Sequence, residues 1–223
     1  MWIAEAIVEG PAAAALALLV AAGGWIAGYF SAWATDLLLV RDGLSTSSAR
    51  KPLVRDALVQ GGLALVWAAL LLVLGPGWHW LIAALLAIPL VQVSVTDLRV
   101  RYVYTAVALA GMLAGLVLSP LEHGAPWWTG LAGAAGGYVA FTVVYHLGRL
   151  LYRGQEPLAR GDVTIAAMVG AIAGPHTAVS LVAGVVFSGL LATLVLVARR
   201  SSQAFMPYGP GLCLGGLLAL FLG

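Results

Sequence analysis

Long apolar segments alternate with short polar segments along this chain. An α-helix needs about 20 mainly apolar residues to cross the hydrocarbon core of a bilayer, and most of the segments are close to that length. The pattern predicts eight transmembrane helices, and therefore an all-α, polytopic membrane protein. The predicted helices lie at about residues 11–33, 57–75, 79–96, 103–119, 127–148, 162–175, 177–198 and 208–223. No separate soluble domain is visible, so we expect one membrane-embedded domain over residues 1–223.

The segment Gly174-Pro175-His176 interrupts one long apolar stretch, and two topologies are open at this point. A single merged helix would leave Arg199 and Arg200 on the side opposite to all other basic residues. Lys and Arg are enriched in cytoplasmic loops, which favours a tight hairpin instead. The first helix of the hairpin would be only about 20 Å long, against roughly 30 Å for the hydrocarbon core. We therefore expect either a thinned bilayer or a recessed helix end here.

The charged residues give the orientation of the predicted helices. With eight helices, all eleven Lys and Arg residues fall on one side of the membrane. The opposite side has no basic residue and carries Glu5, Glu9, Glu122, His79, His123 and His176. Because cytoplasmic loops are enriched in Lys and Arg, we expect both termini outside and the polar segment at 34–56 as the largest cytoplasmic loop.

Composition supports a membrane protein and excludes several kinds of site. Hydrophobic residues make up 62% of the chain and charged residues 9%, with a mean hydropathy of +1.00, whereas soluble domains have about 25% charged residues. The lone Cys213 excludes a disulfide or a cysteine-rich zinc site within one chain. Residues 1–10 contain no Lys or Arg, so we expect no cleavable signal and a retained first helix.

Two aspartates stand at the ends of predicted helices. Asp97 ends the apolar run at 91–96, and Asp162 opens the short helix after Gly161. An ionisable side chain in a membrane helix is costly, which makes each a functional candidate. Either could instead cap a helix N-terminus, and for one aspartate alone that role is an equally good explanation. Two carboxylates from separate helices at one depth can share a proton and activate water without a metal or cofactor.

Three short motifs follow one another in this order: Asp97-Leu98-Arg99, Gly161-Asp162 and Pro207-Tyr208-Gly209-Pro210. In order, spacing and membrane side they resemble the Asp-Ile/Leu-Arg, Gly-x-Gly-Asp and Pro-Phe-Gly-Pro motifs of the type IV prepilin peptidases and the archaeal preflagellin peptidases. The resemblance covers roughly residues 53–223 and implies an aspartic peptidase. It implies catalytic roles for Asp97 and Asp162, and supporting or substrate-binding roles for Arg99, Gly161, Pro207, Gly209 and Pro210.

The chain departs from the family pattern at several positions. Tyr104-Thr105 stands where the family has Pro-Asn, Ala159 replaces the first glycine of Gly-x-Gly-Asp, and Thr164 replaces a common Lys. Longer bacterial members carry two Cys-x-x-Cys pairs that bind zinc in a cytoplasmic insertion associated with N-methylation. This chain has no such cysteines, so the resemblance is to the short, peptidase-only form.

From the resemblance we expect an endopeptidase of the inner (cytoplasmic) membrane that cleaves the basic leader of prepilin-like or preflagellin-like proteins at the cytoplasmic face. It would need no metal and no other cofactor. Its partners would be the substrate and the lipid bilayer, with no nucleic acid, and a homo-oligomer is left open. Two alternatives remain at this point: a small proton-coupled transporter, in which membrane acids relay protons, and an inactive assembly subunit of a pilus or secretion system.

Overall fold

The computed structural model describes residues 11–41, 57–151, 158–199 and 208–222, and these residues are helical with no strand. The all-α prediction is therefore confirmed. The helices are α2 (Pro11–Arg41), α3 (Ala57–Leu74), α4 (Trp78–Val100), α5 (Thr105–Glu122), α6 (Trp128–Leu151), α7 (Arg160–Ala173), α8 (Thr177–Arg199) and α9 (Gly209–Leu220). A short 3-10 helix, η2 (Gly174–His176), joins α7 to α8.

These eight helices of the described chain lie where the apolar segments placed them, with two differences. The first helix continues through Arg41, so Asp36 lies inside α2 and the loop expected at 34–56 begins later. Leucine and valine follow Asp36, and one charge is not enough to end an apolar helix. Residues 42–56 lie outside the described residues. The third predicted helix likewise extends beyond residue 96, so Asp97 is helical.

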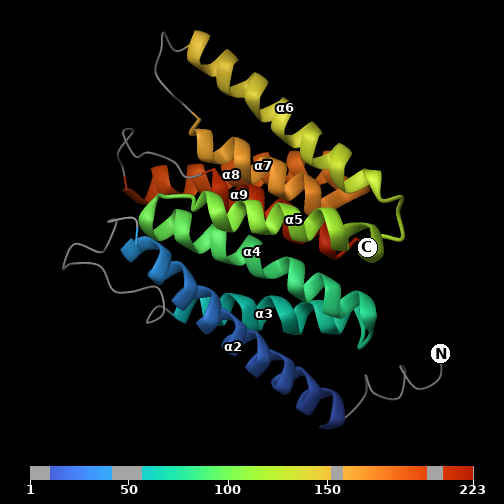
Figure 1. The fold of residues 1–223 in the computed structure, drawn as a ribbon. Helices are drawn as coiled ribbons and strands as arrows, with labels where there is room; N and C mark the ends of the chain where they lie inside the picture. Colours follow the sequence, from blue (N-terminus) through green and yellow to red (C-terminus); the bar gives the residue numbers. More distant parts are fainter. Residues whose placement is uncertain (1–10, 42–56, 152–157, 200–207, 223) are drawn as a thin grey trace.

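The short α7 lies in the middle of the bundle and is covered by α5, α6 and α9 (Figure 1). Its side chains are buried along most of its length, with Ile165, Met168 and Ile172 fully buried. A helix of 14 residues spans only about 21 Å. Because neighbouring helices rather than lipid cover α7, its short length is tolerated within the membrane.

The break after α7 forms a hairpin, as predicted. Gly184 lies against Leu212, and Gly215 lies against the Ser180 backbone, so α8 and α9 are antiparallel. Ile165 reaches Gly209 and Val169 reaches Gly216, so α7 and α9 are parallel. The chain therefore reverses between α7 and α8, at the turn where Gly174 has a positive φ of 52°.

Small residues allow the helices to approach closely. Gly133 and Gly137 of α6 lie against the backbone of α7 at Gly170 and Ala166. A Cβ on either glycine would collide with a main-chain oxygen. The glycine spacings in the sequence therefore mark helix packing, as is common in membrane proteins.

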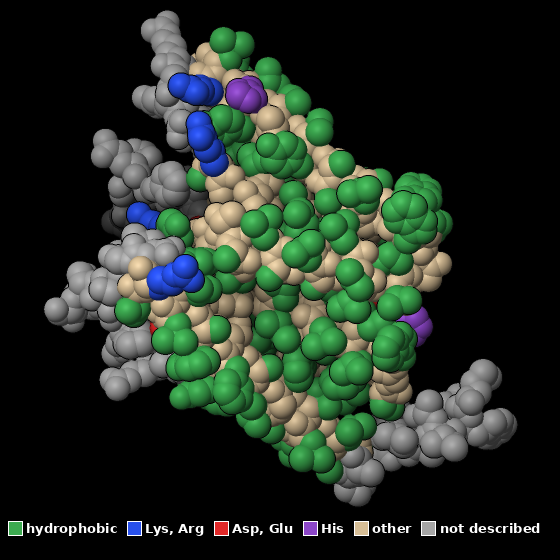
Figure 2. All heavy atoms as spheres, viewed as in Figure 1, with side chains coloured by type: hydrophobic (Ala, Val, Ile, Leu, Met, Phe, Trp, Pro, Cys, Tyr) green, Lys and Arg blue, Asp and Glu red, His purple; other side chains and the backbone are tan. Residues whose placement is uncertain are grey.

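The outer surface of the bundle is apolar, and the charges lie at its two ends. By length and composition, six segments of the described chain can cross a membrane, one of them being the whole α7–α8 hairpin. Figure 2 shows the basic side chains gathered at the end where α2, α4 and α6 finish. We call this the basic end; the helix bounds place there the described side chains of Arg41, Arg99, Arg101, Arg149 and Arg160. The chain is thus a multi-pass membrane protein with a strong charge asymmetry.

Candidate functional site

The two predicted aspartates come together at the basic end. Asp97 lies in the last turn of α4, which ends at Val100, and Asp162 is the third residue of α7. Only 7% of Asp97 and 5% of Asp162 is exposed. The two carboxyl groups interact electrostatically across the space between their helices. Two buried acids held this way are costly to ionise together, so the arrangement favours a proton shared by the pair.

Asp162 is held by the first turn of its own helix. The backbone N–H of Ala159 donates to Asp162 Oδ2 over 3.0 Å, and the N–H of Asp162 donates to the Ala159 carbonyl over 3.0 Å. Asp162 therefore does accept a hydrogen bond at the helix N-terminus, which is the capping role considered above as the alternative to catalysis. The same bond fixes the carboxylate in its position facing Asp97, so capping and a chemical role are compatible.

This contact also explains one departure from the family pattern. Ala159 donates through its backbone, which any residue type can supply. Its φ of −80° and ψ of 152° are ordinary extended values that need no glycine. The replacement of glycine by alanine at this position leaves the support of Asp162 intact.

Asp97 does not cap the next helix, and that alternative is wrong. It lies inside α4, and Tyr104 occupies the N-cap position of α5. After Asp97 the helix ends at Arg101, which has a left-handed φ of 53° and donates its N–H to the Asp97 carbonyl over 3.0 Å. The Arg101 guanidinium also interacts with the Asp97 carboxylate. Arg101 is thus a neighbour of Asp97 that the motif comparison passed over.

The start of α9 covers the Asp97 carboxylate. The backbone N–H of Gly209 faces this carboxylate, while Oδ2 has no hydrogen-bond partner among the described residues. Gly209 and Pro210 are both buried in the first turn of α9, where proline is well tolerated. Ser188 of α8 donates to the Tyr208 carbonyl over 3.0 Å and anchors this turn. Pro207, also predicted to support the site, lies outside the described residues.

The remaining predicted residues lie around the pair in different ways. Gly161 packs against Val103, and a Cβ at position 161 would come within 3.1 Å of a Val103 methyl group. Arg99 is exposed and stands two residues after Asp97, about 200° around the helix. Gly161 therefore joins the α4–α5 turn to the pair, while Arg99 is exposed at the end of α4.

Cys213 is a second neighbour that sequence reasoning did not connect to the site. It is buried one turn beyond Gly209 in α9 and interacts electrostatically with both aspartates. Its spacing of four residues from Gly209 places both on one face of the helix, and this is the signal that could have revealed it.

A separate polar cluster lies at the opposite end of the bundle. Glu122, expected on the outer side, is the last residue of α5 and is only 1% exposed, so a further buried acid ends a spanning helix here. His79 lies 3.9 Å from the Glu122 carboxylate, whose oxygens have no hydrogen-bond partner among the described residues. Burial lowers the pKa of the adjacent His123. The described residues contain no group of three or more His, Cys, Asp or Glu side chains arranged to hold a metal ion.

Comparison with known proteins matches the chain to one family. A family model described as the type IV leader peptidase family matches residues 84–197, a range that contains both aspartates. A prepilin leader peptidase/N-methyltransferase of Dickeya chrysanthemi is 30% identical over 177 residues, covering 78% of this chain and 60% of the relative. The Aeromonas hydrophila protein of the same name is 30% identical over 178 residues, covering 79% and 59%.

A third relative with that name, from Xanthomonas campestris, is 33% identical over 155 residues, which cover 67% of this chain and 52% of the relative. This chain therefore spans little more than half of the length of the curated relatives it matches. No solved structure gives a significant match.

Proposed function

Because this chain belongs to the type IV leader peptidase family, we propose that it is a membrane aspartic endopeptidase that cleaves the basic leader of prepilin-like or preflagellin-like proteins. The observation that carries the proposal is that Asp97 and Asp162, 65 residues apart in the sequence, are both buried and interact electrostatically. The curated relatives are named as prepilin leader peptidases, which supports this substrate class.

The chemistry follows from one proton shared between two carboxyl groups. The ionised carboxylate accepts a proton from a water molecule, whose oxygen forms a bond to the carbonyl carbon of the scissile peptide. The protonated partner donates its proton to the carbonyl oxygen. When the tetrahedral intermediate collapses, the C–N bond breaks, the amide nitrogen takes a proton, and the pair again holds one proton. No group other than the two aspartates is needed to move these protons.

The surroundings of the pair suit this role. The N–H of Gly209 and the guanidinium of Arg101 both favour an ionised Asp97, and Ala159 donates to Asp162. Oδ2 of Asp97 is buried and has no hydrogen-bond partner in the described part of the chain, so it keeps its capacity to accept a hydrogen bond. Both carboxyl groups thus have a neighbour that stabilises the ionised form, as a pair that exchanges one proton needs.

We place the site at the cytoplasmic face of the membrane. The described basic side chains lie at the same end of the bundle as the aspartates, and such residues are retained in the cytoplasm. A substrate with a short leader at its N-terminus, followed by a hydrophobic helix, would present its cleavage point at this depth.

The transporter alternative receives less support. A proton relay across the membrane needs acids near the midplane. Asp97 and Asp162 lie at the basic end, while Glu122 ends its helix at the opposite side. The acidic residues of the described membrane helices thus lie at the two ends of the bundle. No acidic residue of the described helices lies between them to pass a proton across the membrane.

The proposal is tested with the purified chain in liposomes and a substrate made of a basic leader ending in Gly, followed by a hydrophobic helix. We expect mass spectrometry to find one cut after the leader. The Asp162→Asn variant, purified in the same way, should leave the substrate intact. Equal cleavage by parent and variant, or no cleavage by the parent, would overturn the proposal.

A further inference from the structure

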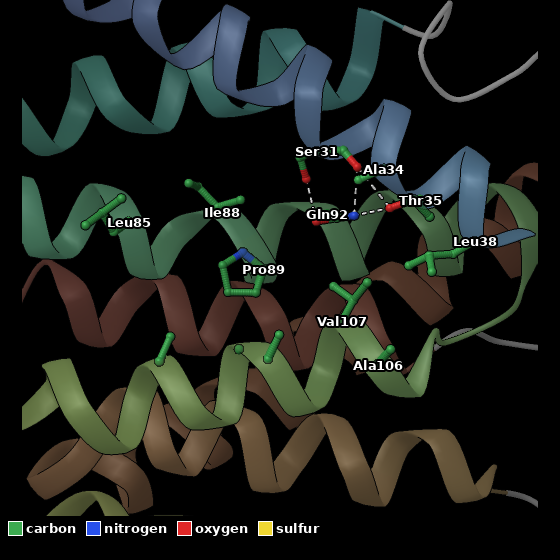
Figure 3. Close-up of a pocket in the computed structure, with 13 residues that line it drawn as sticks. Ser31, Ala34, Thr35, Leu38, Leu85, Ile88, Pro89, Gln92, Ala106 and Val107 are labelled. Carbon is green, nitrogen blue, oxygen red and sulfur yellow. Dashed lines mark hydrogen bonds between the residues drawn. The ribbon is translucent and has the colours of Figure 1, made fainter.

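A groove with a volume of about 340 Å³ runs along α4 between α2 and α5 (Figure 3). Its lining includes Ser31 and Thr35 of α2, Pro89 and Gln92 of α4, and Ala110 of α5. Gln92 precedes Asp97 by five residues, which is about 7.5 Å along the helix and 140° around it. The Gln92 end of the groove therefore lies near the depth of the aspartates, but on another face of α4.

A polar network holds the wall of this groove in place. The Ser31 hydroxyl donates to the Gln92 amide oxygen, and Gln92 Nε2 donates to the Thr35 hydroxyl and, over 3.0 Å, to the Ser31 carbonyl (Figure 3). Gln92 is buried, and polar groups in hydrocarbon are costly unless they are hydrogen-bonded. Separating α2 from α4 would break these bonds. The network therefore holds the two helices, and with them this wall of the groove, in a fixed arrangement.

The opposite wall is built from small residues that leave room for a helix. Ala106, Ala110 and Ala114 follow one another at four-residue spacing on α5 and line the groove. Ala106 and Ala110 are exposed, as is Ala34 across the groove on α2. Small side chains in such rows permit close approach of another transmembrane helix.

One short connection borders both the groove and the aspartate pair. In the turn between α4 and α5, Arg101 donates its N–H to the Asp97 carbonyl, and Val103 packs against Gly161 beside Asp162. The next residue, Tyr104, donates its hydroxyl to the Leu38 carbonyl over 3.2 Å, at the end of the groove nearest the basic end. The α4–α5 turn thus contacts residues beside both the aspartates and this end of the groove.

We propose that this groove binds the hydrophobic helix of the substrate while the segment before that helix crosses the α4–α5 turn and enters the aspartate site. The proposal rests on the proposed function, because that function supplies a substrate with a helix directly after the scissile bond. The helix is apolar enough for the alanine wall, and its N-terminal end lies at the depth of the pair.

Another groove in the described part of the chain is a poorer place for this helix. It has a volume of about 600 Å³ and lies between α6 and α8, beside Trp128, Gly174 and Pro175. Gly174 is twelve residues from Asp162, or roughly 18 Å along α7, at the far side of the membrane. A substrate helix seated there would hold its cleavage point away from the carboxylates.

Filling the groove tests the proposal, because it should impair cleavage of a substrate that has the hydrophobic helix and spare a substrate that lacks it. Ala110→Phe should raise KM for the helix-bearing substrate at least tenfold, while cleavage of a soluble peptide that contains only the leader and the cleavage point stays within twofold of the parent. Ala135→Phe is the matched control, because Ala135 is exposed on α6 and lines neither groove. Equal effects of the two variants, or equal loss on both substrates, would overturn the proposal.

Crosslinking provides a measurement that does not depend on activity. In a Cys213→Ala, Asp97→Asn background, Ala110→Cys should form a disulfide with a cysteine in the second or third turn of the substrate helix, and Ala135→Cys should not. A disulfide between two copies of Ala110→Cys would assign the groove to a second copy of this chain.

Absence of any disulfide would assign the groove to lipid. Either of these two results would overturn the proposal. If the parent cleaves no substrate but the crosslink forms, the proposed function fails while the docking site stands.

Discussion

The backbone of Gly209 lies directly against the Asp97 carboxylate, so that a Cβ atom at position 209 would come within 2.5 Å of Oδ2. The same atom would lie 2.9 Å from Ile165 Cδ1. The first turn of α9 thus forms one wall of the aspartate site, and a side chain at position 209 would have to displace the Asp97 carboxylate or Ile165.

This contact predicts that Gly209→Ala impairs cleavage strongly. Displacement of Asp97 or of α9 by even about 1 Å can cost roughly 100-fold in rate. Overpacking of this kind also costs about 1–3 kcal/mol of stability. Gly136→Ala is the control, since a Cβ there meets nothing within 4 Å. Rates of substrate cleavage and thermal unfolding of both variants check the prediction, which is refuted if Gly209→Ala keeps parental activity.

The two aspartates should behave as one functional unit. We expect Asp97→Asn and Asp162→Asn each to abolish cleavage nearly completely, and the double variant to be hardly worse than either, because groups that share one proton are strongly non-additive. Asp36→Asn, within α2, should cost far less. Single-turnover rates of the four proteins decide this, and multiplicative losses in the double variant would speak for two independent roles.

The pH dependence of cleavage should be bell-shaped. At low pH both carboxyl groups are protonated and no base remains, whereas at high pH both are ionised and no acid remains. The two apparent pKa values then describe the pair and belong to neither residue alone. Measurement of kcat/KM across pH on the liposome-bound protein checks this, and a profile with only one limb over the stable range would contradict a shared proton.

Chelators and removal of the single cysteine should leave cleavage intact. The described residues provide no group of three metal-ligand side chains, and Cys213 lies beside the aspartates without a place in the proton transfers. The sequence has no Cys-x-x-Cys pair, so we also expect no methyl group on the product. Cleavage assays with EDTA and with Cys213→Ala, together with product masses, check this; loss of activity on metal removal would require a different mechanism.

The orientation of the bundle predicts which positions react from each side of the membrane. In a Cys213→Ala background, a cysteine at position 47 should react with an impermeant maleimide only after the membrane is opened. A cysteine replacing Trp127, which is exposed beside the start of α6, should react in intact cells. The reverse pattern would place the aspartate site on the outer side.

The sequence by itself determined where the helices lie and which residues carry the family motifs. Apolar runs of this length have to be helical in lipid, since the backbone can then satisfy its own hydrogen bonds. The ends of the helices were less certain, because a helix continues wherever its backbone can still form hydrogen bonds. The apolar residues after Asp36 extend α2, and α4 continues past its apolar run to include Asp97. Local pattern alone does not fix where such a helix stops.

Only the tertiary structure decided how the helices rotate and approach one another. Close glycine contacts at Gly133 and Gly170 set α6 against α7, and Gly209 sets α9 against Asp97. In the packed bundle Asp97 of α4 interacts with Asp162 of α7, and Glu122 of α5 is buried near His79 at the other end. Hydropathy reports only whether a segment prefers lipid to water. The rotation of each helix depends instead on the shapes of side chains from segments far apart in the chain. The geometry of the site is therefore set only when the helices pack together.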